Sequence, residues 1–206
     1  MSADIEAFLA AAKAGHTDRM VEFLTSGVDP NAQYEYGDTA LIRAAEYDRV
    51  ETVGLLLANG ADPNTQNHFG RTALILAAKS GFMDIVGLLL TNGADPNVQN
   101  KAGHSALMFA AHNGHAEVVE ILLSHRAIPY LKDEDGLTAL HIAAKKGHGG
   151  VLMLLLEAYA EHFSHYSDIP RALVGDKTIE TMTAKESGGL KEDLGALLRR
   201  VTTLFV

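Results

Sequence analysis

The chain contains ten histidines, and histidine is the side chain most often used for metal binding and proton transfer near neutral pH. A local group of nitrogen and oxygen ligands is formed by Glu161, His162, His165 and Asp168. Zinc or nickel accepts such ligands, and solvated loops often contain them as well. We expect these residues to form a solvated loop, and therefore we expect no metal and no cofactor. A ligand- or metal-dependent function of the 159–176 segment is the alternative.

The sequence offers no candidate catalytic residues. Asp133, Glu134 and Asp135 form an acidic run, which we interpret as a solvated turn with acids near a helix N-terminus. The spacings typical of serine hydrolases, phosphate-binding loops, zinc proteases and calcium loops do not occur. With no cysteine, the chain also lacks disulfides and thiol nucleophiles. We therefore predict that the protein is not an enzyme, although a small active site in 159–206 is a further alternative.

Composition limits the remaining classes. The 206 residues are 47% hydrophobic and 21% charged, which is too apolar for a disordered chain. A net charge of −9 argues against binding to nucleic acid or to anionic membranes. Charged and polar residues interrupt every apolar run before it reaches membrane-spanning length. We expect a soluble, cytoplasmic, mostly helical protein, and export into a host cell stays open as an alternative.

The strongest pattern is a repeat of 33 residues. A Gly-x-Thr/Ser-Ala tetrapeptide recurs in one register, at Gly37, Gly70, Gly103 and Gly136. Paired alanines keep the same step, at 11–12, 44–45, 77–78, 110–111 and 143–144. So does a leucine row, at Leu24, Leu57, Leu90, Leu123 and Leu156. Several independent marks in one register predict a repeat architecture.

Each unit predicts two short helices. A hydroxyl residue after the glycine is an N-cap for a helix of roughly ten residues, at Thr39, Thr72, Ser105 and Thr138. That helix ends at a left-handed residue, and a second, more apolar helix follows. An extended Asp-Pro-Asn segment then separates the units, because proline forbids further helix. Helices this short are marginal alone, so neighbouring units must stack.

This unit, Gly-x-Thr-x-Leu, Ala-Ala, Gly-His, Leu-Leu, Gly-Ala-Asp-x-Asn, resembles the ankyrin repeat over residues 1 to about 160. The resemblance implies an all-α fold, a solenoid of paired antiparallel helices joined by β-turn or hairpin fingers in a right-angled, L-shaped stack. It further implies that His16, His115 and His148 bond nearby backbone. The family's Thr-Pro-Leu-His is altered to Thr/Ser-Ala-Leu-x, and His141 alone keeps the histidine, but we expect the same fold.

We interpret residues 1–206 as one ankyrin repeat domain. Its predicted units are an N-terminal capping repeat at 1–33, repeats at 34–66, 67–99, 100–132 and 133–160, and a long loop with a degenerate C-terminal capping repeat at 161–206. A cap at each end favours a complete array. Arg126 occupies a glycine position, and Ile128 and Tyr130 replace the usual Asp and Asn. This irregular turn is either ordinary drift with repacking or an exposed apolar spot for a partner.

The resemblance implies that function lies in surface recognition. In ankyrin repeats the turn tips and the exposed face of each first helix form a concave groove that binds other proteins. Carried over to this chain, the predicted partner-binding residues are Glu35, Tyr36, Asp38, Glu46, Tyr47, His68, Phe69, Arg71, Lys79, Lys101, His104, His112, Asn113, Leu137, Lys145 and Lys146.

These positions change in chemistry along the chain. Repeat 2 is acidic and contains two tyrosines, whereas the groove floor further along carries lysines. We therefore predict that an extended or helical partner segment lies across repeats 2 to 4, with its basic or aromatic part over Tyr36, Glu46 and Tyr47. The partner is another protein, and we expect the chain alone to be a monomer that acts as adaptor, inhibitor or assembly chaperone.

Overall fold

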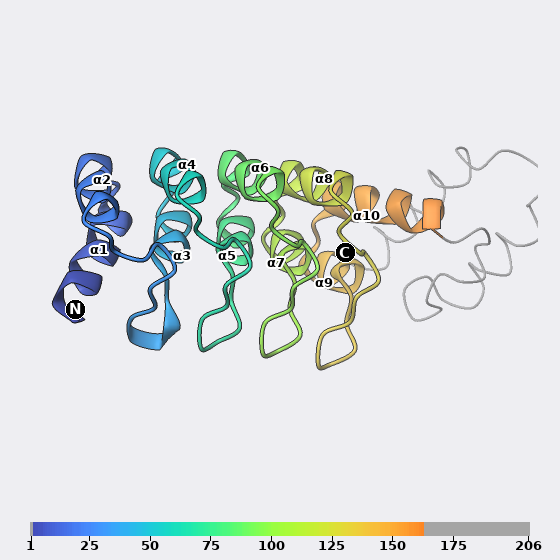
Figure 1. Ribbon diagram of the computed structural model, residues 1–206. Helices are drawn as coiled ribbons and strands as arrows, with labels where there is room; N and C mark the ends of the chain where they lie inside the picture. Colours follow the sequence, from blue (N-terminus) through green and yellow to red (C-terminus); the bar gives the residue numbers. More distant parts are fainter. Residues whose placement is uncertain (1, 163–206) are drawn as a thin grey trace, which may run out of the picture.

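Five pairs of antiparallel helices stand side by side in chain order in the computed structural model, which describes residues 2–162 (Figure 1). The pairs are α1 (Ser2–Ala14) with α2 (Thr17–Thr25), α3 (Ala40–Glu46) with α4 (Val50–Ala58), α5 (Ala73–Ser80) with α6 (Met83–Thr91), α7 (Ala106–Asn113) with α8 (Ala116–Ser124), and α9 (Ala139–Lys146) with α10 (Gly149–His162). The odd-numbered helices form one layer and the even-numbered helices a second layer. This arrangement confirms the predicted helical solenoid.

The helices of the first layer begin at the predicted hydroxyl residues. Thr39 Oγ1 accepts the Ile42 amide at 3.2 Å, and Thr72 and Ser105 make the equivalent bond in the next two repeats. Each of these bonds satisfies an orphan amide of the first turn. From repeat 2 onward these helices are seven or eight residues long, shorter than the ten predicted. The positive φ of 57° at Asp48 ends the first of them, where later repeats have glycine.

Small side chains let the inner helices pack closely. The paired alanines of all five repeats are buried, which confirms their role as spacers between neighbouring helices. In the outer helices, the fully buried leucines are Leu56, Leu89, Leu122 and Leu155. The predicted leucine row lies one residue later and is partly exposed at Leu57 and Leu123. Leu90 and Leu156 of that row are buried.

Four fingers project from one side of the inner layer (Figure 1). A backbone bond closes each finger at its base, for example from the Asn67 amide to the Arg71 carbonyl at 3.0 Å. Neighbouring fingers also bond to one another, as the Lys101 amide does to the Phe69 carbonyl at 3.2 Å. Gly70 is needed at this approach, because its φ is +73° and a Cβ there would lie 2.8 Å from the Lys101 nitrogen.

Asparagine side chains link the Asp-Pro-Asn segments of successive repeats. Asn64 Nδ2 donates to the Gly93 carbonyl at 3.0 Å, and its Oδ1 accepts the Asp95 amide at 2.7 Å. Asn31 and Asn97 repeat the arrangement one unit earlier and one unit later. The last link reaches Ile128 and Arg126, so the irregular turn keeps the connection even though Arg126 has a φ of 66°.

The fifth repeat ends differently from the others. Its outer helix α10 has 14 residues where the preceding outer helices have nine, and it continues through Tyr159, which stands at the glycine position of earlier repeats. Tyr159 is buried, and its hydroxyl donates to the Pro129 carbonyl at 3.2 Å. The predicted loop at 159–176 is therefore wrong over 159–162, which is helical. The rest of that loop, with His165 and Asp168, and almost all of the predicted C-terminal cap at 161–206 lie outside the described residues.

Candidate functional site

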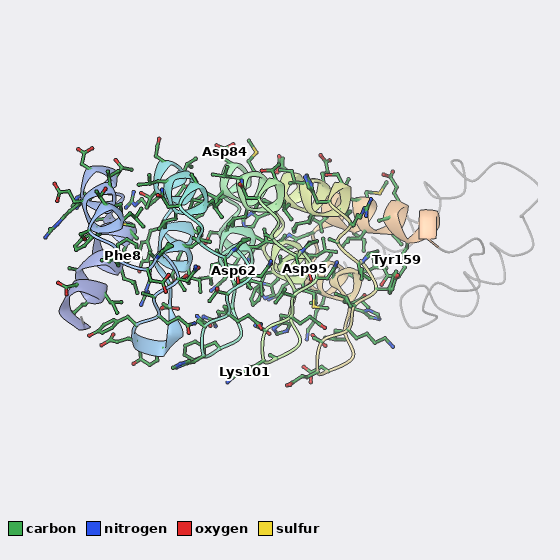
Figure 2. The ribbon with its side chains drawn as sticks, in the orientation of Figure 1. Phe8, Asp62, Asp84, Asp95, Lys101 and Tyr159 are labelled. Carbon is green, nitrogen blue, oxygen red and sulfur yellow. The ribbon has the colours of Figure 1, made fainter. Side chains whose placement is uncertain are left out.

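The predicted partner-binding residues lie on the fingers and on the C-terminal ends of the inner helices. Figure 2 shows Lys101 at a finger end, whereas Asp84 lies on the outer layer away from the fingers. Most of the predicted residues are exposed: Glu35, Tyr36, Tyr47, His68, Phe69, Lys79, Lys101, His112, Asn113, Lys145 and Lys146. Glu46, Arg71, His104 and Leu137 are half-buried.

Asp38 does not fit the prediction. It is only 7% exposed, and its carboxylate accepts from Asn67 Nδ2 at 2.8 Å and pairs with Arg43 at 3.0 Å. Arg43 also pairs with Glu46 at 3.2 Å. Asp38 therefore braces the first finger against the second finger and against helix α3. The repeat pattern predicts an exposed residue after the turn glycine, but in repeat 2 Asn67 of the neighbouring finger covers this position.

Two aromatic rings from adjacent fingers contact one another. The ring centroids of Tyr36 and Phe69 are 6.1 Å apart, and the Arg71 guanidinium lies 5.3 Å from the Phe69 centroid. Tyr36 is nevertheless 61% exposed and Phe69 49% exposed. A pair of large apolar side chains with this much exposure is typical of a protein contact surface.

Tyr47 forms a second aromatic element at the end of α3. The Lys13 ammonium from the preceding repeat lies 4.6 Å from the centre of its ring, within cation–π distance. Glu46 stands beside Tyr47 and is held by Arg43. The surface formed by the first two fingers and the end of α3 thus combines aromatic faces with carboxylates.

The C-terminal part of the groove contains an open cleft of about 380 Å³ between the last two fingers and helices α7 and α9. Five predicted residues from the helix ends border it: Lys79, His112, Asn113, Lys145 and Lys146. Its apolar lining includes Phe109 and Ile142, which are not among the predicted residues. Helical spacing would have found them, because each lies three residues before a predicted groove residue, His112 or Lys145.

Several histidines have structural roles. His115 Nε2 contacts the Lys79 carbonyl at 3.1 Å and His148 Nε2 contacts the His112 carbonyl at 3.0 Å, which confirms the predicted backbone bonds for these two. Burial, together with nearby Lys132, lowers the pKa of His141 although Asp133 opposes the shift. A lowered pKa favours the neutral ring, which agrees with its Nδ1 accepting from the Thr138 amide at 3.3 Å.

In the described part of the chain, no group of three or more histidine, aspartate or glutamate side chains is placed to hold a metal ion. The predicted cluster at 161–168 is not tested by this observation, since it lies at and beyond the end of that part.

The repeat geometry agrees with a comparison against protein families. The family model described as ankyrin repeats (3 copies) matches residues 8–100 and 83–165. The chain belongs to the ankyrin repeat family. Ankyrin repeats are generally protein–protein interaction modules, and the family is typically non-catalytic. A comparison with curated proteins finds no match. Within the described residues of this ankyrin repeat protein, none of the helices is both long and apolar enough to cross a membrane.

Proposed function

We propose that this ankyrin repeat protein is a non-catalytic binding module that holds a segment of a partner protein in its concave groove. The observation that supports the proposal most is the set of exposed aromatic side chains on that face, Tyr36, Phe69 and Tyr47. Exposed aromatic side chains dominate the energetics of many protein interfaces. An adaptor, an inhibitor or an assembly chaperone of one cytoplasmic protein would each work in this way.

In this proposal an extended or helical partner segment lies across repeats 2 to 4. Its basic or aromatic part contacts Tyr36, Glu46 and Tyr47, where the groove offers carboxylates beside aromatic faces. The other proposed contacts are Glu35, His68, Phe69, Arg71, Lys79, Lys101, His104, His112, Asn113, Leu137, Lys145 and Lys146. Asp38 supports the finger and does not contact the partner. The free protein is monomeric in this proposal.

The test is a double substitution, Tyr36→Ala with Tyr47→Ala. The partner is first isolated by co-purification from native lysate. Removing the two contact rings should weaken its binding at least tenfold, which corresponds to about 1.4 kcal/mol of binding free energy. Titration calorimetry measures the affinity. The thermal midpoint should stay nearly unchanged, because both side chains are exposed. Val21→Ala with Met83→Ala is the matched control, since both are exposed apolar residues on the outer helices.

Two results would contradict the proposal. One is an unchanged affinity of the double tyrosine variant. The other is a structure of the complex in which the partner contacts only the outer helices.

A further inference from the structure

The open cleft in the C-terminal half of the groove has an apolar floor. Met108 and Phe109 of α7, Ile142 of α9, and Leu137 at the base of the last finger line it. Phe109 and Ile142 are half-buried, and His104 packs edge-on against Phe109 with ring centroids 5.4 Å apart. The volume of about 380 Å³ is at the lower end of the range typical for ligand pockets and exceeds what one large side chain needs.

The apolar floor of the cleft differs from the groove floor of repeat 2. In repeat 2 the positions equivalent to Ile142 and Leu137 are Arg43 and Asp38, which form an ion pair at 3.0 Å. There the groove floor is filled by a charged pair, and an apolar side chain placed against it would have to displace or desolvate that pair. The groove therefore changes from an ionic floor in repeat 2 to an apolar floor in repeats 4 and 5.

Charge is distributed unevenly around the cleft. On the helix side, Lys79, Lys145 and Lys146 are exposed, and none forms an ion pair with any carboxylate of the described residues. On the finger side, the Asp133 carboxylate is already engaged, because it accepts the Asp135 and Leu137 amides at 3.0 and 2.7 Å. It also contacts His104 Nε2 at 3.4 Å. Asp135 is the other acid that lines the cleft, and both Asp135 and its neighbour Glu134 are exposed on the last finger.

We propose that this cleft binds a large apolar side chain of an acidic partner segment, with the flanking aspartate or glutamate residues directed to the ends of α5 and α9. The apolar floor takes the side chain, and the three unpaired ammonium groups attract the carboxylates. This inference rests on the proposed function, because it assigns a partner chemistry to one end of the same groove. It also orients the partner: its acidic, apolar part lies over repeats 4 and 5, and its basic or aromatic part lies over repeat 2.

A direct test uses blocked pentapeptides and the full chain labelled at methionine and isoleucine methyl groups. Glu-Glu-Leu-Glu-Glu should cause saturable shifts of the Met108 and Ile142 methyl signals at millimolar concentration, and the shifts should weaken as salt is added. Replacing the central leucine by alanine should weaken binding at least fivefold. Lys-Lys-Leu-Lys-Lys should cause no shift. Absence of a shift with the glutamate peptide, or equal shifts with the lysine peptide, overturns the inference.

Charge reversal locates the site. Lys145→Glu should weaken binding of the glutamate peptide at least fivefold, because it replaces an attracting charge at the cleft edge by a repelling one. Arg19→Glu makes the same change of charge on exposed α2, far along the array, and should leave binding within twofold of the unaltered protein. Equal effects of the two variants would mean that only net charge matters, which also overturns the inference.

The tyrosine variant separates this inference from the proposed function. Tyr36→Ala with Tyr47→Ala should bind the glutamate peptide normally, since both tyrosines lie outside the cleft. If the tyrosine variant loses the partner while the peptide never binds, the proposed function stands and the inference fails. If the peptide binds at the cleft but neither the tyrosine variant nor the Lys145 variant changes the affinity for the partner, the proposed function fails instead.

Discussion

Thr52 lies in helix α4 with its hydroxyl buried and without a hydrogen bond to any described residue. The next three repeats place Ile85, Val118 and Val151 at the same position, and all three are buried. A buried hydroxyl without a partner loses its hydration and gains nothing in return. The sequence shows that Thr52 is the polar residue at a position that is aliphatic in the next three repeats. That its hydroxyl has no hydrogen-bond partner among the described residues becomes evident only from the packed structure.

Thr52→Val should therefore stabilise the protein. We expect the free energy of unfolding to rise by about 1 kcal/mol, since an unsatisfied buried polar group costs about 1–3 kcal/mol. Urea denaturation followed by circular dichroism measures the change. Thr39→Val is the matched control, because the same substitution removes the N-cap bond to Ile42 and should lower stability by about 1 kcal/mol. A loss of stability in the Thr52 variant would show that its hydroxyl has a role.

At the scale of elements, local sequence decides where most helices begin and end. The N-cap residues, the left-handed residues and the Asp-Pro-Asn segments act within a few residues, so their effect is readable without knowing the fold. Side-chain hydrogen bonds between neighbouring repeats are harder to predict from the sequence. The Asp-Pro-Asn pattern places Asn64 in a connecting segment, but it does not show that the side chain bonds to two groups of the next repeat, at Gly93 and Asp95.

Asn64→Ala should weaken the junction between repeats 2 and 3. Two exposed hydrogen bonds are lost, which predicts a decrease of about 1–2 kcal/mol in the free energy of unfolding. Asn59→Ala serves as control, because the Asn59 side-chain Nδ2 donates to the Leu55 carbonyl within its own repeat. Both variants are measured by urea denaturation. Equal losses from the two substitutions would argue against a role of the asparagine link in joining repeats.

At the scale of the whole molecule, the extensive helix contacts lie within one repeat or between adjacent repeats. In a solenoid each repeat packs mainly against its neighbours, so within the described residues the stability of the first repeat depends mainly on the second. Phe8 is fully buried in repeat 1 and meets Phe23 edge-on, with ring centroids 5.8 Å apart. Phe8 is labelled in Figure 2, at the terminal pair of helices.

Phe8→Ala should unfold the first repeat locally and leave the centre of the array folded. A buried Phe→Ala change costs about 3–5 kcal/mol, which exceeds the free energy of local unfolding that we expect for one terminal repeat. Hydrogen exchange should show loss of protection in α1 and α2 while α7 keeps its protection. Leu107→Ala in α7, which has a repeat on either side, should instead lower protection in both neighbouring repeats. Uniform loss across residues 2–162 in the Phe8 variant would contradict nearest-neighbour coupling.

The sequence by itself determined the repeat length, the helix starts, the finger glycines and the alanine spacers. These features follow from interactions within one unit, and the same local pattern can be read in several units of the sequence. The tertiary structure decided which surface positions are free. Asp38 is covered by the next finger, Phe109 and Ile142 line a cleft, and α10 runs on through Tyr159. Burial depends on what the neighbouring repeat places against a residue, and that neighbour lies about 33 residues away, beyond the reach of local pattern.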